Sequence, residues 1–162
     1  MIPRDEIRPL YLTMLTLGVL ALVILAAGLV DFFAFEPLGQ HTGSHATVIG
    51  VFRYDPASGQ VTGPDSQRFT LDEAFAAEID WTSLPPTMEV AARWFNTLGT
   101  TVGGVGPAPA GQLVDHSIVP VKISQGFRHN VPGDYDFVVE RYQNGQPVEV
   151  LARRLVYVRS AI

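Results

Sequence analysis

The hydrophobic and polar positions divide the chain into two parts with different patterns. From Leu10 to Val30 no residue is charged. A helix of about 20 apolar residues crosses a hydrocarbon core of about 30 Å. Beyond residue 44 the apolar positions come instead in short runs separated by Gly, Pro, Asn and Asp, as in strands and turns. The pattern therefore predicts one transmembrane helix followed by a β-rich domain.

The charges on either side of the uncharged run predict its orientation. Arg4 and Arg8 precede it, whereas no Lys or Arg follows between Asp31 and Arg53. Basic residues near a membrane span stay on the cytoplasmic side. The run also exceeds the apolar core of a signal peptide, about 7 to 15 residues, so we expect a retained anchor. The competing interpretation is a cleaved leader, for which Ala26-Ala27-Gly28 is a partial cleavage motif.

These features divide the chain into four segments. We expect a cytoplasmic tail over residues 1–9, a transmembrane helix over 10–35, a linker over 36–44 and an extracytoplasmic β-sandwich domain over 45–162. This organisation predicts a single-pass protein of a bacterial inner membrane, with its C-terminal domain in the periplasm.

The β-rich part carries turn residues about every 8 to 12 residues, as in a sandwich. We expect strands at residues 45–54, 67–71, 78–81, 87–97, 100–105, 117–124, 135–142 and 147–159. Asn144-Gly145 predicts a hairpin between the last two, and Pro120 predicts an edge strand. The expected fold class is therefore a single transmembrane α-helix plus an all-β domain, an antiparallel two-sheet (Ig-like) sandwich.

Three segments have weaker patterns. Residues 87–97 fit either helix or strand, and the flanking Pro and Gly residues favour strand. Thr70-Leu71-Asp72-Glu73 matches a capping box, which predicts a helical turn over residues 74–77. The glycine-rich and proline-rich stretch Gly103–Gly111 is expected to form a loop.

The last third of the chain resembles bacterial immunoglobulin-like and fibronectin-like modules. Pro132-Gly133-Asp134-Tyr135, with Asn144-Gly145 after it, resembles the last two strands of such modules. Asp80-Trp81, Leu84-Pro85-Pro86 and Arg93-Trp94 resemble their middle, where a tryptophan-bearing strand packs into the core. The resemblance covers residues 45–159 and implies an immunoglobulin-like sandwich. The disulfide cysteines of antibody domains are missing.

Composition excludes several functions. The net charge of −5 is spread without a basic stripe, which excludes nucleic-acid binding. The chain has no cysteine, which excludes disulfides, thiolate nucleophiles and thiolate metal sites. The uncharged run also lacks histidine, so it offers no ion site and no ligand for a membrane-embedded pigment.

Residues with metal or catalytic chemistry form no recognised pattern. The histidines are His41, His45, His116 and His129. Gly43 opposes the helix that would bring the first two together. Asp115-His116-Ser117 holds the residue types of a hydrolase triad, but neighbours on an extended chain point in opposite directions.

An acidic patch formed by Asp72, Glu73, Glu78 and Asp80 lacks the spacing of a calcium site. We therefore expect no enzyme activity, cofactor, metal site or small-molecule substrate.

Two sets of residues are expected to contact partners. Small residues on one side of the predicted helix would let another helix approach closely. This candidate packing face consists of Met14, Gly18, Ala21, Leu25 and Gly28. A lipid-facing anchor with incidental small residues is the alternative. Phe127 and Arg128 lie in a polar loop and form a candidate partner contact, with a buried loop plug as the alternative for Phe127.

The sequence predicts a non-catalytic accessory subunit of a multi-subunit bacterial membrane complex. Its helix would pack in the lipid bilayer against other subunits, and its β domain would brace the periplasmic face. No motif names the host, for which we expect a photosynthetic reaction-centre and light-harvesting assembly or a respiratory complex. The alternative is a membrane-anchored periplasmic binding or assembly factor that handles metal, in which the histidines would converge.

Overall fold

The computed structural model describes residues 13–23, 41–122 and 130–160. The chain forms two compact units, Met1–Leu38 and Gly39–Ile162. In the first unit, residues 13–23 form one short helix with exposed side chains. Within the described ranges, no helix is both long and apolar enough to cross a membrane. Most of the span expected over residues 10–35 lies outside those ranges.

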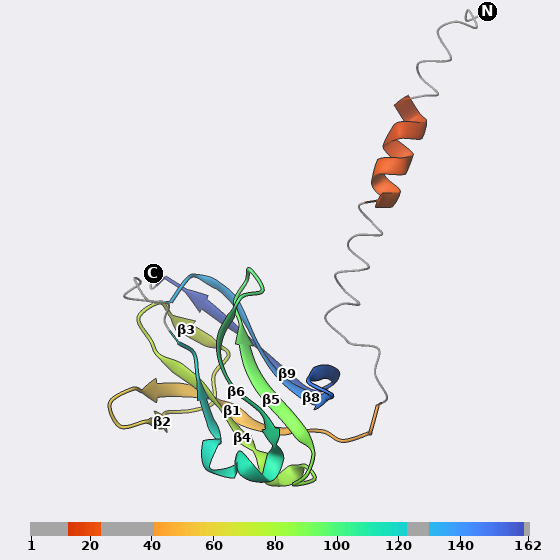
Figure 1. Cartoon of the computed structure of the whole chain (residues 1–162). Coiled ribbons are helices and arrows are strands. Elements are labelled where there is room, and N and C mark those ends of the chain that lie inside the picture. Colours follow the sequence, from red (N-terminus) through yellow and green to blue (C-terminus); the bar gives the residue numbers. More distant parts are fainter. Residues whose placement is uncertain (1–12, 24–40, 123–129, 161–162) are drawn as a thin grey trace, which may run out of the picture. The chain divides into compact units, whose positions relative to one another are not determined.

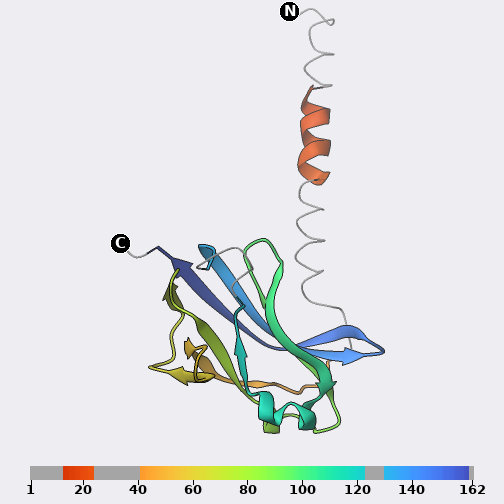
Figure 2. The same cartoon turned by 60° about the vertical axis from the view of Figure 1, so that its left-hand side comes forward.

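The second unit consists mostly of β-strands in two sheets (Figures 1 and 2). The four-stranded sheet has the order β2 (Gln60–Thr62), β1 (Thr47–Asp55), β4 (Phe75–Asp80) and β7 (Ile118–Pro120). The five-stranded sheet has the order β3 (Arg68–Thr70), β9 (Gln146–Arg159), β8 (Gly133–Gln143), β5 (Glu89–Phe95) and β6 (Thr101–Pro109). Three short 3-10 helices complete the described elements: η1 (Trp81–Ser83), η2 (Ala110–Gln112) and η3 (Val114–His116).

The prediction of a wholly antiparallel sandwich is wrong at one strand. β3 pairs in parallel with β9, with Arg68 opposite Tyr157. After β2 the chain leaves the first sheet and joins the edge of the second, where it runs in the same direction as the last strand. The Tyr157 amide donates to the Gln67 carbonyl at 2.8 Å and extends this pairing. The other strand pairs of the described domain are antiparallel.

The predicted helical turn over residues 74–77 is wrong, although its capping signal forms locally. The Thr70 amide donates to Glu73 Oε2 at 2.7 Å. The chain then extends as β4 because Phe75, Ala77 and Ile79 alternate into the core. Burial of these side chains outweighs the local helix signal.

The predicted loop over Gly103–Gly111 is also wrong, because most of it belongs to β6. Glycine allows β6 to lie close to its neighbour β5. A Cβ atom on Gly104 would lie 2.7 Å from the Ala92 carbonyl oxygen. The glycine and proline content therefore reflects an edge strand paired at short range rather than a loop.

The two tryptophans both bond to the segment that holds η3 and β7, and Trp94, on β5, thereby connects the two sheets. Trp94 is fully buried, and its Nε1 donates to the Val119 carbonyl at 2.8 Å. Trp81 Nε1 donates to the His116 carbonyl at 3.2 Å. Phe75 packs edge-on against Trp94 at 5.4 Å between ring centroids. The core therefore contains interlocked aromatic rings whose polar atoms are satisfied.

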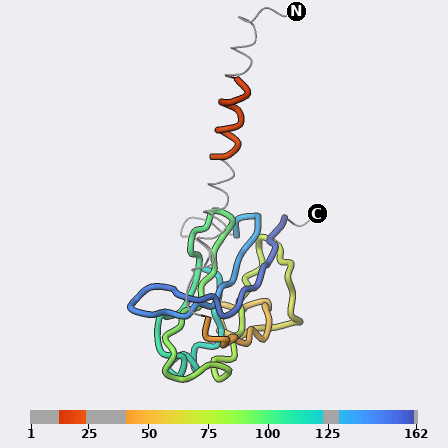
Figure 3. Tube along the Cα trace, turned by 90° about the vertical axis from the view of Figure 1, so that its right-hand side faces the viewer, coloured from red at the N-terminus to blue at the C-terminus, as the bar shows by residue number. Residues whose placement is uncertain are grey.

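The strongest local predictions are confirmed. β8 and β9 form a hairpin in which Asn144 and Gly145 take φ values of 54° and 74°, and it projects from the rest of the domain (Figure 3). β7, which contains Pro120, lies at the edge of its sheet. Residues 87–97 contain β5, a strand.

Tyr135 fixes the beginning of β8. Its hydroxyl donates to the Val131 carbonyl at 2.9 Å and accepts from the Val131 amide at 3.1 Å. Both bonds run four residues back along the chain, so the turn that leads into the strand is closed by a buried side chain.

Candidate functional site

The predicted partner contacts lie only partly in the described residues. Met14, Gly18 and Ala21 are exposed on the helix of residues 13–23. Leu25 and Gly28 lie outside the described residues, as do Phe127 and Arg128.

The described histidines lie at the surface of the domain. His41, His45 and His116 are exposed, and His129 lies outside the described residues. The described ranges contain no group of three or more His, Cys, Asp or Glu side chains that could hold a metal ion.

The acidic patch and the Asp115-His116-Ser117 motif are described by the structure. Glu73 forms an ion pair with Arg53 at 2.7 Å, and Asp80 accepts from Thr82 at the start of η1. Asp115 and His116 are exposed in η3 rather than on an extended chain. Glu73 therefore contributes to an ion pair and Asp80 to a turn.

The best-defined polar site of the domain lies where residues 41–46, the leading segment, meet the β8–β9 hairpin. Glu149 on β9 is only 3% exposed. Its carboxylate accepts from the Thr42 amide at 2.8 Å, the Thr42 hydroxyl at 3.0 Å and Arg141 Nε at 2.8 Å. We call Glu149, Arg141 and Thr42 the hairpin clamp.

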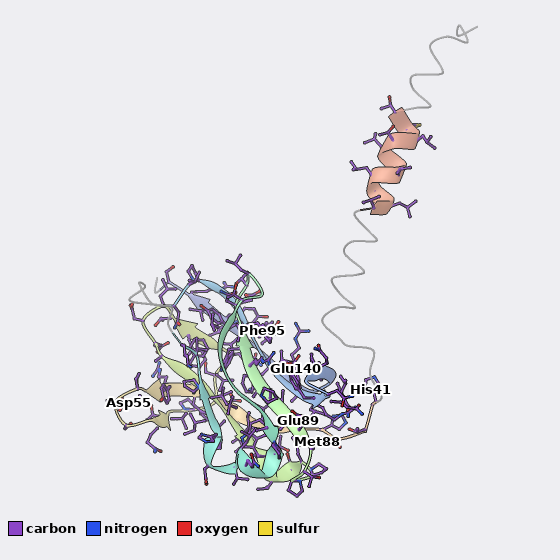
Figure 4. All side chains as sticks on the ribbon, in the orientation of Figure 1. His41, Asp55, Met88, Glu89, Phe95 and Glu140 are labelled. Carbon is purple, nitrogen blue, oxygen red and sulfur yellow. The ribbon has the colours of Figure 1, made fainter. Side chains whose placement is uncertain are left out.

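Neighbouring contacts extend the hairpin clamp along the chain. His41 Nδ1 lies 3.9 Å from Glu149 Oε1, and Figure 4 shows His41 beside the hairpin. The Ala46 amide donates to the Leu151 carbonyl at 3.2 Å. The leading segment is therefore attached at both ends to β9.

The hairpin clamp favours the charged form of Glu149. Burial by itself would raise the pKa of Glu149, but hydrogen bonds from Thr42 and Arg141 outweigh it and lower the pKa below 4.5. A carboxylate in this setting stays ionised at neutral pH and holds its donors with charge-assisted bonds. The arrangement attaches the leading segment to the hairpin.

The hairpin clamp does not follow from the local sequence pattern. A two-residue Asn-Gly turn that pairs Gln143 with Gln146 would place Arg141 opposite Val148, but a register shift brings it opposite Glu149. The only local signal was that Glu149 lies among apolar residues of a predicted strand. The Thr42 contact spans 107 residues and has no local signal.

A second polar group lies on the outer face of the five-stranded sheet. Arg93 lies 3.9 Å from Glu140 and 5.2 Å from the centre of the Tyr142 ring. Burial raises the pKa of Glu140, and Arg93 offsets part of that rise. Burial likewise raises the pKa of Tyr142. These side chains satisfy one another and cover the sheet.

Comparison of the sequence with protein families and with curated proteins gives no match to guide the interpretation. No protein-family description matches the sequence, and no curated protein is significantly similar to it.

Proposed function

We propose that this chain is a membrane-anchored, non-catalytic accessory subunit of a multi-subunit membrane complex. One observation carries the proposal: the uncharged run from Leu10 to Val30 follows a tail with Arg4 and Arg8 and lies outside the compact β unit, which begins at Gly39. Such a run is long enough to span a bilayer, and the basic tail favours a cytoplasmic N-terminus. The β domain then lies on the extracytoplasmic side.

The finer fold that we propose for the domain is an immunoglobulin-like sandwich. The neighbour order β9-β8-β5-β6 corresponds to strands G, F, C and C′ of that fold, and β1-β4-β7 to strands A, B and E. Two further features support it: a buried tryptophan, Trp94, on the strand equivalent to C, and the Tyr135 hydroxyl bonded back to Val131. Domains of this fold serve commonly as binding and spacing modules, an argument by analogy.

The hairpin clamp supports a tethering role. Glu149 fixes Thr42, close to the first residue of the domain, onto β9. A tether fixed at this point has a defined length, and a short tether raises the effective concentration of the domain near the other subunits. A modest interface then suffices to keep the domain in place.

Purification of the full chain through a C-terminal tag in mild detergent tests the proposal. The expected result is stoichiometric recovery of a larger membrane complex by mass spectrometry. An absorption spectrum of the same sample then distinguishes a pigment-bearing photosynthetic host from a haem-bearing respiratory host.

Leu20→Arg provides a matched control for the tether. A charge at the centre of the run opposes insertion by about 3 kcal/mol, so this variant should lose both the membrane fraction and the complex. Recovery of the unaltered chain alone, without other subunits, would contradict the proposal. In that case the alternative of a transient periplasmic factor becomes the better explanation.

A further inference from the structure

The outer face of the four-stranded sheet is apolar. Along β1, Val51 belongs to the core, and alternation places Phe52 and Tyr54 on the opposite side. A Cβ atom on Gly50 would lie 2.7 Å from the Phe52 ring, which shows that this ring covers the outer side of the strand. The pairing register adds four apolar residues. We call the resulting set the Phe52 face: Phe52, Tyr54, Val61, Ala76, Ile118 and Pro120.

The Phe52 face is separate from the core. None of its six residues belongs to the core cluster or packs against it. Five of the six are half-buried rather than covered, and Ile49, at the irregular point of β1, is 51% exposed. Partly exposed apolar side chains that lie together on an outer face are available to pack against another molecule.

Carboxylates lie at the Phe52 face. Asp65, whose carboxyl carbon would lie 3.0 Å from a Cβ atom on Gly50, is paired with Arg154. Glu78 pairs with Gly50 on one side and with Ile118 on the other, and it is half-buried. Among the described residues Glu78 has no ion-pair partner, and the cation nearest along β1, Arg53, lies opposite Phe75 and is paired with Glu73. A carboxylate among apolar groups gains stability when a cation covers it.

The outer face of the five-stranded sheet differs from the Phe52 face in that its charged residues are paired. There Arg153 binds Asp136 through two hydrogen bonds of 2.6 and 3.1 Å, and Arg93 lies against Glu140. The charged residues at the centre of that face are paired with one another. The Phe52 face instead leaves Glu78 without a cation from the described part of the domain.

We propose that the Phe52 face docks a segment of a partner protein that presents apolar side chains and a Lys or Arg opposite Glu78. This inference rests on the proposed function and deepens it by naming the surface that meets the host complex. A second copy of the chain fits less well, because it would bring two Glu78 carboxylates together. An anionic lipid surface meets the same repulsion.

Site-specific photocrosslinking in the native membrane tests this proposal. A benzophenone amino acid replaces Phe52 in the full chain, and in a separate chain it replaces Phe95, a half-buried phenylalanine on the five-stranded sheet. The expected result is a crosslink from position 52 that mass spectrometry maps to a protein segment with Lys or Arg. Position 95 should give little product.

Charge variants test the role of Glu78. Glu78→Lys should lower the crosslink yield from position 52 about tenfold, while Glu78→Gln lowers it less. Glu89→Lys, at a half-buried glutamate on the other sheet, should leave the yield unchanged. Thermal unfolding of each variant verifies that the fold is intact.

Several results would overturn the docking proposal: a crosslink only to lipid, only to a second copy, equal yields from positions 52 and 95, or no crosslink. A complex that still co-purifies in those cases would leave the accessory-subunit proposal standing. Absence of any complex would overturn both.

Discussion

Arg141 on β8 and Glu149 on β9 form a buried ion pair across the last hairpin, with 2.8 Å between Nε and Oε2. The same carboxylate binds the backbone and hydroxyl of Thr42. One buried glutamate therefore joins the beginning of the domain to its penultimate and final strands, which are distant in sequence.

Replacing the central carboxylate should destabilise the domain. Glu149→Gln removes the charge that holds Thr42 and the largely buried Arg141 guanidinium, and so weakens the charge-assisted contacts to both. We expect the free energy of unfolding to fall by about 3 kcal/mol in urea denaturation. Glu89→Gln, a half-buried glutamate with no ion pair among the described residues, should change it by less than about 0.5 kcal/mol. Equal denaturation midpoints for the two variants would show that the hairpin clamp contributes nothing.

Acid should weaken the domain through the same group. The folded-state pKa of Glu149 lies below its ordinary value of 4.5, so the unfolded chain binds the proton more tightly. The stabilisation of the folded domain by Glu149 is complete above pH 4.5 and is lost as the pH falls through the lowered pKa. Glu73 acts in the same direction, because hydrogen bonding from the Thr70 amide lowers its pKa.

Glu140 acts in the opposite direction. Burial raises its pKa, so protonation in acid removes the free-energy cost of burying its charge. Urea denaturation at a series of pH values should show the stability difference between the unaltered chain and Glu149→Gln shrinking below pH 4.5. A difference that stays constant into acid would contradict the assignment.

The indole of Trp94 should matter more than that of Trp81. Trp94→Phe removes a fully buried hydrogen bond to Val119 and opens a cavity between the sheets, at a cost of about 3 kcal/mol. Trp81→Phe removes a longer bond to His116 and should cost less. Thermal unfolding followed by circular dichroism measures both. The reverse order would mean that the core is organised around Trp81.

The Tyr135 hydroxyl should stabilise the turn before β8. Tyr135→Phe keeps the buried ring but leaves the Val131 amide and carbonyl without their partner, at a cost of about 1 kcal/mol. Tyr157→Phe is the control, because the structure gives the Tyr157 hydroxyl no hydrogen bond among the described residues. Equal thermal midpoints for the two variants would remove this support for an immunoglobulin-like fold.

The sequence pattern predicted those parts of the fold that depend only on residues close together in the chain. The Asn144-Gly145 turn and the alternating runs around it specify the β8–β9 hairpin directly. Gly104 was misread because its role depends on the approach of β5, which no local pattern contains. The hairpin clamp was missed for the same reason, since Thr42 and Glu149 meet only after the whole domain has folded.

Labelling single cysteines from outside the membrane tests the central claim most directly. The chain has no cysteine, so Gln143→Cys on the exposed hairpin and Ile2→Cys in the tail each provide one thiol. A maleimide that cannot cross membranes is added to spheroplasts before or after lysis. Membrane-bound protein in which Gln143→Cys reacts before lysis and Ile2→Cys reacts only afterwards is the expected result. Reaction of both only after lysis, or recovery of the chain without membranes, would contradict an anchored extracytoplasmic domain.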